Sequence, residues 1–222
     1  MIGKSIVVAP HPDDEVLGVG GAILRRKAEG TKVAWLIVTA ISVESGWSEE
    51  KVKQRADEIR RVKELFDFDE VFILNFPTTQ LDRVPLSDLV NAVSDVFNSF
   101  MPEEVFIPHP SDIHTDHRIV FNAVASCTKW FRYPYIKRIL AYETLSETDF
   151  SLCIEPCFQP NVFMNISPFI NDKLRAMSIY SSELETFPFP RSHEAIRSLA
   201  AIRGAASGFD AAEAFMLLKE IV

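Results

Sequence analysis

The chain has 222 residues, of which 47% are hydrophobic and 24% are charged. This balance is typical of soluble globular proteins and excludes disordered and collagen-like chains. Asp and Glu outnumber Lys and Arg by 31 to 23, giving a net charge of −8. Because the sequence has no basic cluster, we expect no nucleic-acid partner. The most apolar stretch, residues 33–43, is too short for a membrane span, which needs roughly 20 residues.

Short apolar runs alternate with amphipathic stretches as far as residue 142. The apolar runs predict strands at 5–9, 32–39, 70–74, 104–107 and 138–142. The stretches between them predict helices at 15–29, 49–66, 85–100 and 116–130. This order is typical of a Rossmann-like, doubly wound α/β fold, in which a mostly parallel sheet carries helices on both faces.

The residue composition changes at about residue 150, where prolines become frequent. One more strand is predicted at 161–165, and helices are predicted at 168–180, 192–203 and 210–220. The sequence therefore predicts a Pro-rich, helical C-terminal part. It contains no internal repeat or long linker, so we predict a single domain over residues 1–222.

The three cysteines predict reduced thiols in a cytoplasmic protein. Cys127, Cys153 and Cys157 cannot all pair with one another. The CxxxC spacing of Cys153 and Cys157 could hold a metal, but the sequence has no second cysteine pair to complete such a site. We expect Cys127 to lie in the core.

A His-Pro-Asp-Asp-Glu segment follows the first predicted strand directly. In an open α/β sheet, ligands bind at the carboxyl ends of the strands. Asp13, Asp14 and Glu15 would repel one another there without a cation or a substrate. A structural alternative is that Asp13 caps the next helix while its neighbours favour the positive end of that helix. That alternative explains the acids but not His11.

A histidine cluster follows the fourth predicted strand. His109, His114 and His117 fall within nine residues of one another. His114 and His117 are three residues apart at a helix start, so both imidazoles can face the same way. Asp116 can accept a hydrogen bond from one of them. The alternative is a solvated loop with incidental histidines.

Both motifs stand at the same edge of the predicted sheet. Together they supply two or three histidines and several carboxylates, enough for a three-ligand metal site with an open position for water. Two histidines and one carboxylate suit catalytic zinc and also non-haem iron(II), so the spacing leaves the metal open. The glycines at 18–21 fall inside a helix, which favours close packing over a dinucleotide-binding loop.

The sequence resembles the PIG-L (LmbE-like) family of zinc-dependent N-acetylglucosaminyl deacetylases. The resemblance covers nearly the whole chain and is carried by the segments at 9–15 and 114–120, the glycines at 18–21, Arg55-x-x-Glu58, and the segments at 188–192, 203–204 and 211–215. It implies a Rossmann-like fold, a Zn²⁺ cofactor and an N-acetylated sugar as substrate. The C-terminal segments resemble bacterial members associated with surface-polysaccharide or glycoconjugate biosynthesis.

The resemblance implies roles for matching residues. His11, Asp14 and His117 would hold the zinc. Two departures accompany the match: Pro10 replaces an Ala that usually precedes the motif histidine, and the loop at 41–48 lacks the Gly- and Arg-rich pattern of many members. The second departure leaves the identity of the sugar open, because that loop faces the substrate in this family.

The family pattern also implies the catalytic residues. Asp13 would be the general base, and His114, oriented and kept protonated by Asp116, would stabilise the oxyanion. Arg55 would contact the substrate; its alternative is a surface ion pair with Glu58 on the same helix face.

These inferences predict a metal-dependent hydrolase that removes an N-acetyl group from an amino sugar or a sugar conjugate. Two alternatives stay open: an iron(II) oxygenase using the same two histidines and carboxylate, and a non-catalytic sugar- or metal-binding module. The metal could also be Fe²⁺ or another divalent ion. The sequence does not fix the oligomeric state, and a homo-oligomer is compatible with it.

Overall fold

The computed structural model describes residues 2–152 and 158–222. Its strands are β1 (Lys4–Ala9), β2 (Lys32–Ala40), β3 (Glu70–Pro77), β4 (Glu104–Pro108), β5 (Arg138–Tyr142), β6 (Val162–Asn165) and β7 (Ala212–Glu220). Its helices are α1 (Asp14–Ala28), α2 (Glu49–Phe66), α3 (Leu86–Phe100), α4 (Thr115–Ser126), α5 (Ile170–Met177) and α6 (His193–Ala205), with a short 3-10 turn, η1 (Leu81–Arg83). The strands and helices predicted as far as residue 142 are confirmed, with ends that shift by a few residues.

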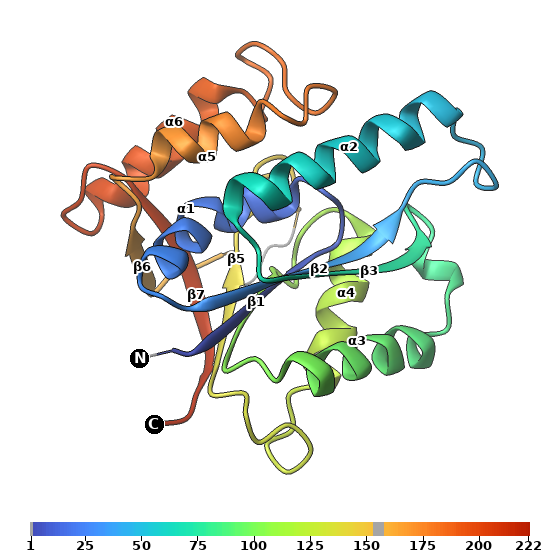
Figure 1. Ribbon diagram of the computed structural model, residues 1–222. Coiled ribbons are helices and arrows are strands. Elements are labelled where there is room, and N and C mark those ends of the chain that lie inside the picture. The colour runs from blue at the N-terminus through green and yellow to red at the C-terminus, as the bar shows by residue number, and fades with distance from the viewer. Residues whose placement is uncertain (1, 153–157) are drawn as a thin grey trace.

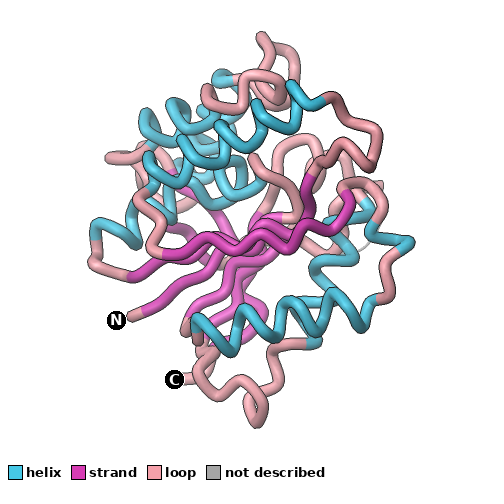
Figure 2. The backbone as a smooth tube through the Cα atoms, turned by 45° about the vertical axis from the view of Figure 1, so that its right-hand side comes forward, coloured by secondary structure: helices cyan, strands magenta, loops and turns pink. Residues whose placement is uncertain are grey.

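The strands form one sheet in the order β3-β2-β1-β4-β5-β7-β6. The pairings from β3 through β5 are parallel, whereas β7 runs antiparallel to both β5 and β6. Helices α1, α2, α5 and α6 cover one face, and α3 and α4 cover the other (Figure 1). The rotated view shows the strands enclosed between the two helical layers (Figure 2). The predicted doubly wound, mostly parallel α/β fold is confirmed.

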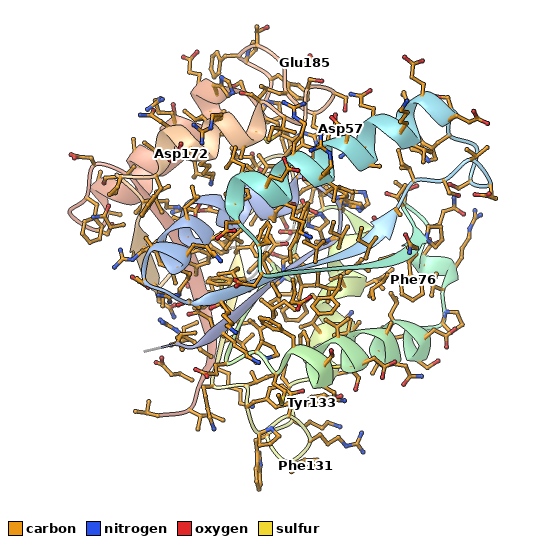
Figure 3. All side chains as sticks on the ribbon, viewed as in Figure 1. Asp57, Phe76, Phe131, Tyr133, Asp172 and Glu185 are labelled. Atoms are coloured by element: carbon orange, nitrogen blue, oxygen red, sulfur yellow. The ribbon has the colours of Figure 1, made fainter. Side chains whose placement is uncertain are left out.

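Apolar side chains fill the space on both sides of the sheet (Figure 3). In β1, Val7 belongs to the cluster beneath α1 and α2, whereas Ile6 and Val8 belong to the cluster facing α3 and α4. Burial on both faces explains why the strand reads as a continuous apolar run. Among the described helices, none is both long and apolar enough to cross a membrane.

Helix α1 lies very close to the sheet. A Cβ atom at Gly18 would overlap the ring of Tyr142 on β5, and the Tyr142 hydroxyl donates to the Val8 carbonyl at 2.9 Å. This confirms that the glycines of α1 serve close packing. It also fixes the start of α1, which carries Asp14 and Glu15 and is preceded by Asp13, against the centre of the sheet.

The predicted helix at 210–220 is wrong, because this segment forms strand β7. Its Ala, Glu, Met, Leu and Lys residues favour a helix on intrinsic propensity alone. Two neighbouring strands instead satisfy its backbone, and its side chains alternate between the two cores. Phe215 and Leu217 face the cluster beneath α1, while Met216 packs against the opposite one. The C-terminal part is therefore mixed α/β rather than helical.

Helix α4 ends at Ser126, four residues before its predicted end. Side chains near its terminus bond the last carbonyls: Ser126 Oγ donates to Asn122 O at 2.9 Å and Thr128 Oγ1 donates to Ala125 O at 2.8 Å. These side-chain bonds add partners for carbonyls of the last turn. Cys127, just beyond, is free and buried as expected. Cys153 and Cys157 lie outside the described residues.

Candidate metal centre

The two sequence motifs meet at the carboxyl ends of the central strands. The segment after β1 begins α1, the segment after β4 begins α4, and β1 and β4 are adjacent in the sheet. A cavity of about 290 Å³ lies over this edge, lined among others by His11, Asp13, Asp14, His114 and His117. Its size is at the lower end of the range for small-molecule sites.

Three side chains converge as a metal ligand set would. Asp14 Oδ2 lies 3.4 Å from His11 Nδ1 and 3.3 Å from His117 Nε2. Ligand atoms of all three residues lie within 4.8 Å of one another. Asp14 is held in place because its Oδ2 also accepts the backbone N–H of His11 at 2.8 Å.

A second carboxylate holds the far nitrogen of each imidazole. Asp116 Oδ2 lies 3.0 Å from His11 Nε2, and Asp112 Oδ2 lies 2.8 Å from His117 Nδ1. Metal-bound histidines are usually oriented in this way, because the outer carboxylate fixes the tautomer and makes the ring more basic. Asp112 is fixed in turn by Thr148 Oγ1, which donates to its Oδ1 at 2.6 Å.

The charges of this cluster are strongly coupled. Burial lowers the pKa of His11, but its bonds to Asp116 and Asp14 outweigh that effect and raise the pKa to about 9. Burial is likewise outweighed at His117, whose pKa is well above its usual value because of Asp14 and Asp112. The same two imidazoles hold the pKa of Asp14 well below its ordinary range, although burial alone would raise it. A buried carboxylate is thus kept anionic.

These residues fit a divalent metal. Two imidazole nitrogens and one carboxylate oxygen, each oriented by further hydrogen bonds, suit catalytic zinc and equally non-haem iron(II). A second grouping of His11, His114 and Asp116 also brings ligand atoms together. It suits a metal less well, because Asp116 already accepts the backbone N–H groups of Thr79 and Leu81 besides facing His11.

Asp13 faces the cavity from a strained backbone. It precedes α1 with φ 131°, in the region that non-glycine residues avoid, and its side chain makes no capping hydrogen bond. Asp13 thus stands at the N-cap position of α1 as the structural alternative expected, but the expectation that its side chain caps the helix is wrong. Burial, Asp14 and Glu183 raise the pKa of the Asp13 carboxyl to about 7, against the opposing effect of Arg191 and His11. A carboxylate with such a pKa is well matched to proton transfer near neutrality.

The third acid of the motif has a structural role. Glu15 is completely buried, accepts the Tyr180 hydroxyl at 2.7 Å and accepts the backbone N–H of Asp13 at 3.0 Å. Burial raises its pKa to about 8. Glu15 therefore helps to hold the strained Asp13 backbone and ties it to the C-terminal part of the chain.

His114 is oriented differently from what the family pattern implied. The backbone N–H of Asp116 donates to His114 Nδ1 at 3.1 Å, while the Asp116 carboxylate bonds His11 instead. Burial and the neighbouring cations His11 and His117 lower the pKa of His114 to about 4. The expectation of an imidazolium held by the Asp116 carboxylate is thus wrong. With Nδ1 accepting, the neutral ring carries its proton on Nε2 and can donate from there.

Arg55 reaches from α2 to the cavity wall. Its Nη1 donates to the Pro12 carbonyl at 2.7 Å and its Nη2 donates to Glu183 Oε1 at 2.6 Å, while Nε lies 3.1 Å from Glu58 Oε2. The simple surface ion pair is wrong, because the side chain is only 17% exposed and joins three segments around the site. A substrate contact by Arg55 stays a prediction.

Sequence reasoning missed three residues around the site. Asp112 supports His117, and Glu183 and Arg191 come from the Pro-rich segment to line the cavity. Arg191 Nη1 lies 3.4 Å from Asp13 Oδ2 and 3.4 Å from Glu183 Oε2. The position of Asp112 two residues before His114 was an available signal. Nothing in the local sequence links Arg191 to Asp13, more than 170 positions away.

Comparison with known proteins places these observations in a family. The family model described as PIG-L: GlcNAc-PI de-N-acetylase matches residues 6–128. The chain belongs to this family. The match contains every residue of the metal cluster and Asp13, His114 and Arg55, whereas the cavity residues Glu183 and Arg191 lie beyond it.

Individual proteins match a larger part of the chain than the family model does. An uncharacterized deacetylase, YaiS, from Escherichia coli (strain K12) is 28% identical over 184 residues, which are 80% of this chain and 90% of the relative. Diacetylchitobiose deacetylase from Thermococcus kodakarensis is 24% identical over 96% of this chain and 82% of its own length. The crystal structure of the conserved protein TT1542 from Thermus thermophilus superposes with a TM-score of 0.79 at 26% identity, covering 100% of this chain and 97% of that one. Similarity to a solved structure thus extends through the C-terminal part of the chain.

Proposed function

We propose that this protein is a metal-dependent hydrolase that removes the N-acetyl group from an amino sugar or a sugar conjugate, with zinc as its metal. The observation that carries the proposal is the buried His11–Asp14–His117 cluster, whose two imidazoles are each backed by a second carboxylate, beside the cavity-facing Asp13. Membership of the PIG-L family and the deacetylase names of its relatives support the reaction class.

In this proposal His11, Asp14 and His117 hold the metal. A bound divalent metal would supply a water acidic enough to lose its proton near neutral pH and would polarise the amide carbonyl. The chain provides the rest of the chemistry. Asp116 and Asp112 keep the two imidazoles in the tautomers that present Nδ1 of His11 and Nε2 of His117 to the ligand position.

Asp13 acts as the general base. Its carboxylate lies beside Asp14 but its pKa is raised rather than lowered, so it can take the proton of the attacking water and later give it to the departing amine. Asp14 cannot do so, because the two imidazoles hold it anionic. In this proposal Asp14 is therefore the metal ligand and the adjacent Asp13 is the base.

His114 stabilises the negative charge that develops on the amide oxygen. Its Nδ1 is occupied by the Asp116 N–H, so Nε2–H is the donor that the ring offers to the cavity. A preorganised donor of this kind contributes roughly 3–4 kcal/mol to catalysis. The proposal thus uses a neutral imidazole as the donor.

A panel of N-acetylated sugars tests the proposal directly. The purified protein, loaded with Zn²⁺, is incubated with N-acetylglucosamine, N,N'-diacetylchitobiose and nucleotide- or lipid-linked N-acetyl sugars, and released acetate is measured. Release of acetate and an equal amount of free amine is expected from at least one of them. Absence of acetate from all of them, with the metal bound, would contradict the proposal.

Metal analysis separates the proposal from its alternatives. Protein purified without added metal is expected to carry zinc. Iron in its place, with O₂ consumption that depends on a sugar, would favour the oxygenase alternative. A non-catalytic module predicts sugar binding with no turnover, which the cavity-facing Asp13 disfavours because a binding site needs no base.

A further inference from the structure

Two loops flank the metal cluster on opposite sides. The metal-binding motifs follow β1 and β4, which are central in the sheet, whereas β2 lies on the far side of β1 and β5 lies on the far side of β4. The loop after β2 contributes Trp47 to the cavity wall, and the loop after β5 contributes Glu147. A ligand seated over the metal cluster therefore has Trp47 on one side and Glu147 on the other.

Trp47 is held by a tightly bonded loop. Ser42 and Ser45 exchange hydrogen bonds through their side chains and backbone, and Trp47 N donates to Ser42 O at 3.2 Å. Gly46 takes a positive φ of 91°, which lets the chain turn immediately before the tryptophan. Ser48 then caps α2 by accepting the N–H of Lys51 at 3.3 Å. The indole is thus presented from a defined position.

The indole ring is open towards the cavity. Trp47 is 37% exposed although it lines the cavity wall, and the Lys51 ammonium lies 5.4 Å from its ring centroid. Lys51 itself is exposed and is not part of that wall. An exposed aromatic face at a cavity mouth is a surface on which the C–H face of a sugar ring can stack.

Glu147 offers a free hydrogen-bond acceptor on the other side. Its backbone is fixed, because Glu147 N donates to Thr144 O at 3.1 Å and Ile113 N donates to Glu147 O at 3.1 Å. The second of these bonds ties the loop to the segment carrying His114. Its carboxylate is half-buried and accepts no hydrogen bond from residues 2–152 or 158–222. An acceptor left open in a cavity wall is suited to ligand hydroxyl groups.

The cations of the cavity are already paired. Arg55 donates to Glu183, and Arg191 lies between Glu183 and Asp13. The cavity wall therefore lacks a spare cation beside the reacting position for a phosphate or carboxylate group, within the described residues. Its unused features are an aromatic face and a carboxylate, which match a neutral ring bearing hydroxyl groups.

We propose that Trp47 and Glu147 bind the pyranose ring of a neutral N-acetyl sugar from two sides. Trp47 stacks on the C–H face of the ring, and Glu147 accepts hydrogen bonds from its hydroxyl groups. The inference rests on the proposed function, since it places the ring next to the metal cluster. It assigns sugar recognition to the loops after β2 and β5, outside the two metal-binding motifs.

Two kinds of measurement test this assignment. Steady-state kinetics are run on the best substrate of the panel for Trp47→Ala, Trp47→Phe and Glu147→Gln. We expect KM to rise about tenfold for Trp47→Ala and about fivefold for Glu147→Gln, with kcat changed about twofold or less, because ground-state and transition-state binding are lost together. Trp47→Phe retains an aromatic face and is expected to stay within about threefold of wild type.

Calorimetric titration of the metal-free protein with the free amino sugar supplies a readout that needs no turnover. The same variants are expected to lose affinity by similar factors while keeping the zinc content of wild type when reloaded. Trp130→Ala is the matched control, because Trp130 is 67% exposed and pairs with Phe131 in the loop before β5, at the opposite end of the sheet (Figure 3).

The possible outcomes are distinguishable. Wild-type affinity and KM in both Trp47→Ala and Glu147→Gln would overturn the inference while leaving the proposed function intact. Sugar binding that depends on both residues but releases no acetate would support the inference and contradict the proposed function. Absence of any sugar binding by wild-type protein would overturn the inference.

Discussion

Two buried charged clusters lie along helix α1, one beneath its middle and one at its start, and they differ in whether their charged groups face a cavity. Beneath its middle, Glu213 of β7 accepts the backbone N–H groups of Gly21 and Ala22 at 2.8 and 2.7 Å, and Lys173 of α5 donates to it at 2.6 Å. Lys173 also donates to the Leu17 carbonyl at 2.8 Å. Within the described residues this cluster is closed, since its carboxylate and its ammonium are satisfied by the chain.

The cluster at the start of the same helix is open, in the sense that its inner side chains line the cavity. Asp14 faces two imidazole nitrogens that both point at one ligand position, Asp13 has a raised pKa, and His114 directs a donor into the cavity. The outer carboxylates Asp112 and Asp116 face away from the cavity to bond the chain, while the inner groups line the cavity. Buried charge therefore indicates structure where the chain completes its bonds and chemistry where it leaves them directed at a cavity.

Removal of the metal has the largest expected effect on the open cluster. Dialysis against a strong chelator is expected to abolish acetate release, and added Zn²⁺ is expected to restore it, because the water is otherwise too weak an acid to be activated. The closed cluster should keep the fold intact, so far-ultraviolet circular dichroism is expected to stay unchanged. Full activity after long dialysis with chelator would contradict metal dependence.

Breaking the closed cluster is expected to affect stability. Glu213→Ala leaves the Lys173 ammonium, whose side chain is only 5% exposed, without its counterion. Loss of one partner of a buried pair costs about 3–5 kcal/mol in the free energy of unfolding. Urea denaturation measures this change.

Arg60→Ala is the control, because Arg60 pairs with Asp57 and Glu64 while 57% exposed. Its loss is expected to cost less than about 1 kcal/mol in the free energy of unfolding. Equal effects of the two substitutions would contradict the assignment.

Substitutions of Asp13 and His117 test whether the cluster at the start of α1 has a separate base and a separate metal ligand. Asp13→Asn is expected to lower kcat by about 100-fold or more while the protein keeps its zinc, because it removes the proposed base and spares the proposed ligands. His117→Ala is expected to lose the zinc itself. Kinetics combined with metal analysis of both variants check this. A similar fall in metal content in the two variants would show that Asp13 is a ligand.

Arg55 gives the smallest expected change. Arg55→Lys cannot reproduce the fork that bonds both the Pro12 carbonyl and Glu183. We expect kcat/KM to fall about tenfold, or about 1.4 kcal/mol, with zinc content near that of wild type. Arg60→Lys on the same helix is the matched control. An unchanged kcat/KM for Arg55→Lys would leave Arg55 with a structural role alone.

The sequence by itself predicted the parallel part of the sheet and the residues of the metal cluster. Apolar runs predicted the strands as far as β5. The signal is strongest in β1 and β2, where both faces are buried and nearly every position is apolar. The meeting of the two polar motifs follows from the same topology, because parallel strands end at one edge of a sheet and the motifs follow β1 and β4. The resemblance to the PIG-L family singled out His11, Asp14 and His117 from these residues. The structure brings the three side chains together, and their role as ligands stays a prediction.

Only the tertiary structure decided the features that depend on contacts between distant segments. β7 has a helical composition and becomes a strand because β5 and β6 offer it hydrogen bonds on both sides. Asp116 turns to His11 rather than His114, since the chain at Thr79 and Leu81 fixes its carboxylate. Arg191 reaches Asp13 across more than 170 positions. Local propensity and residue spacing cannot predict contacts between such distant segments. These contacts contribute free energy only after the helical layers have packed against the sheet.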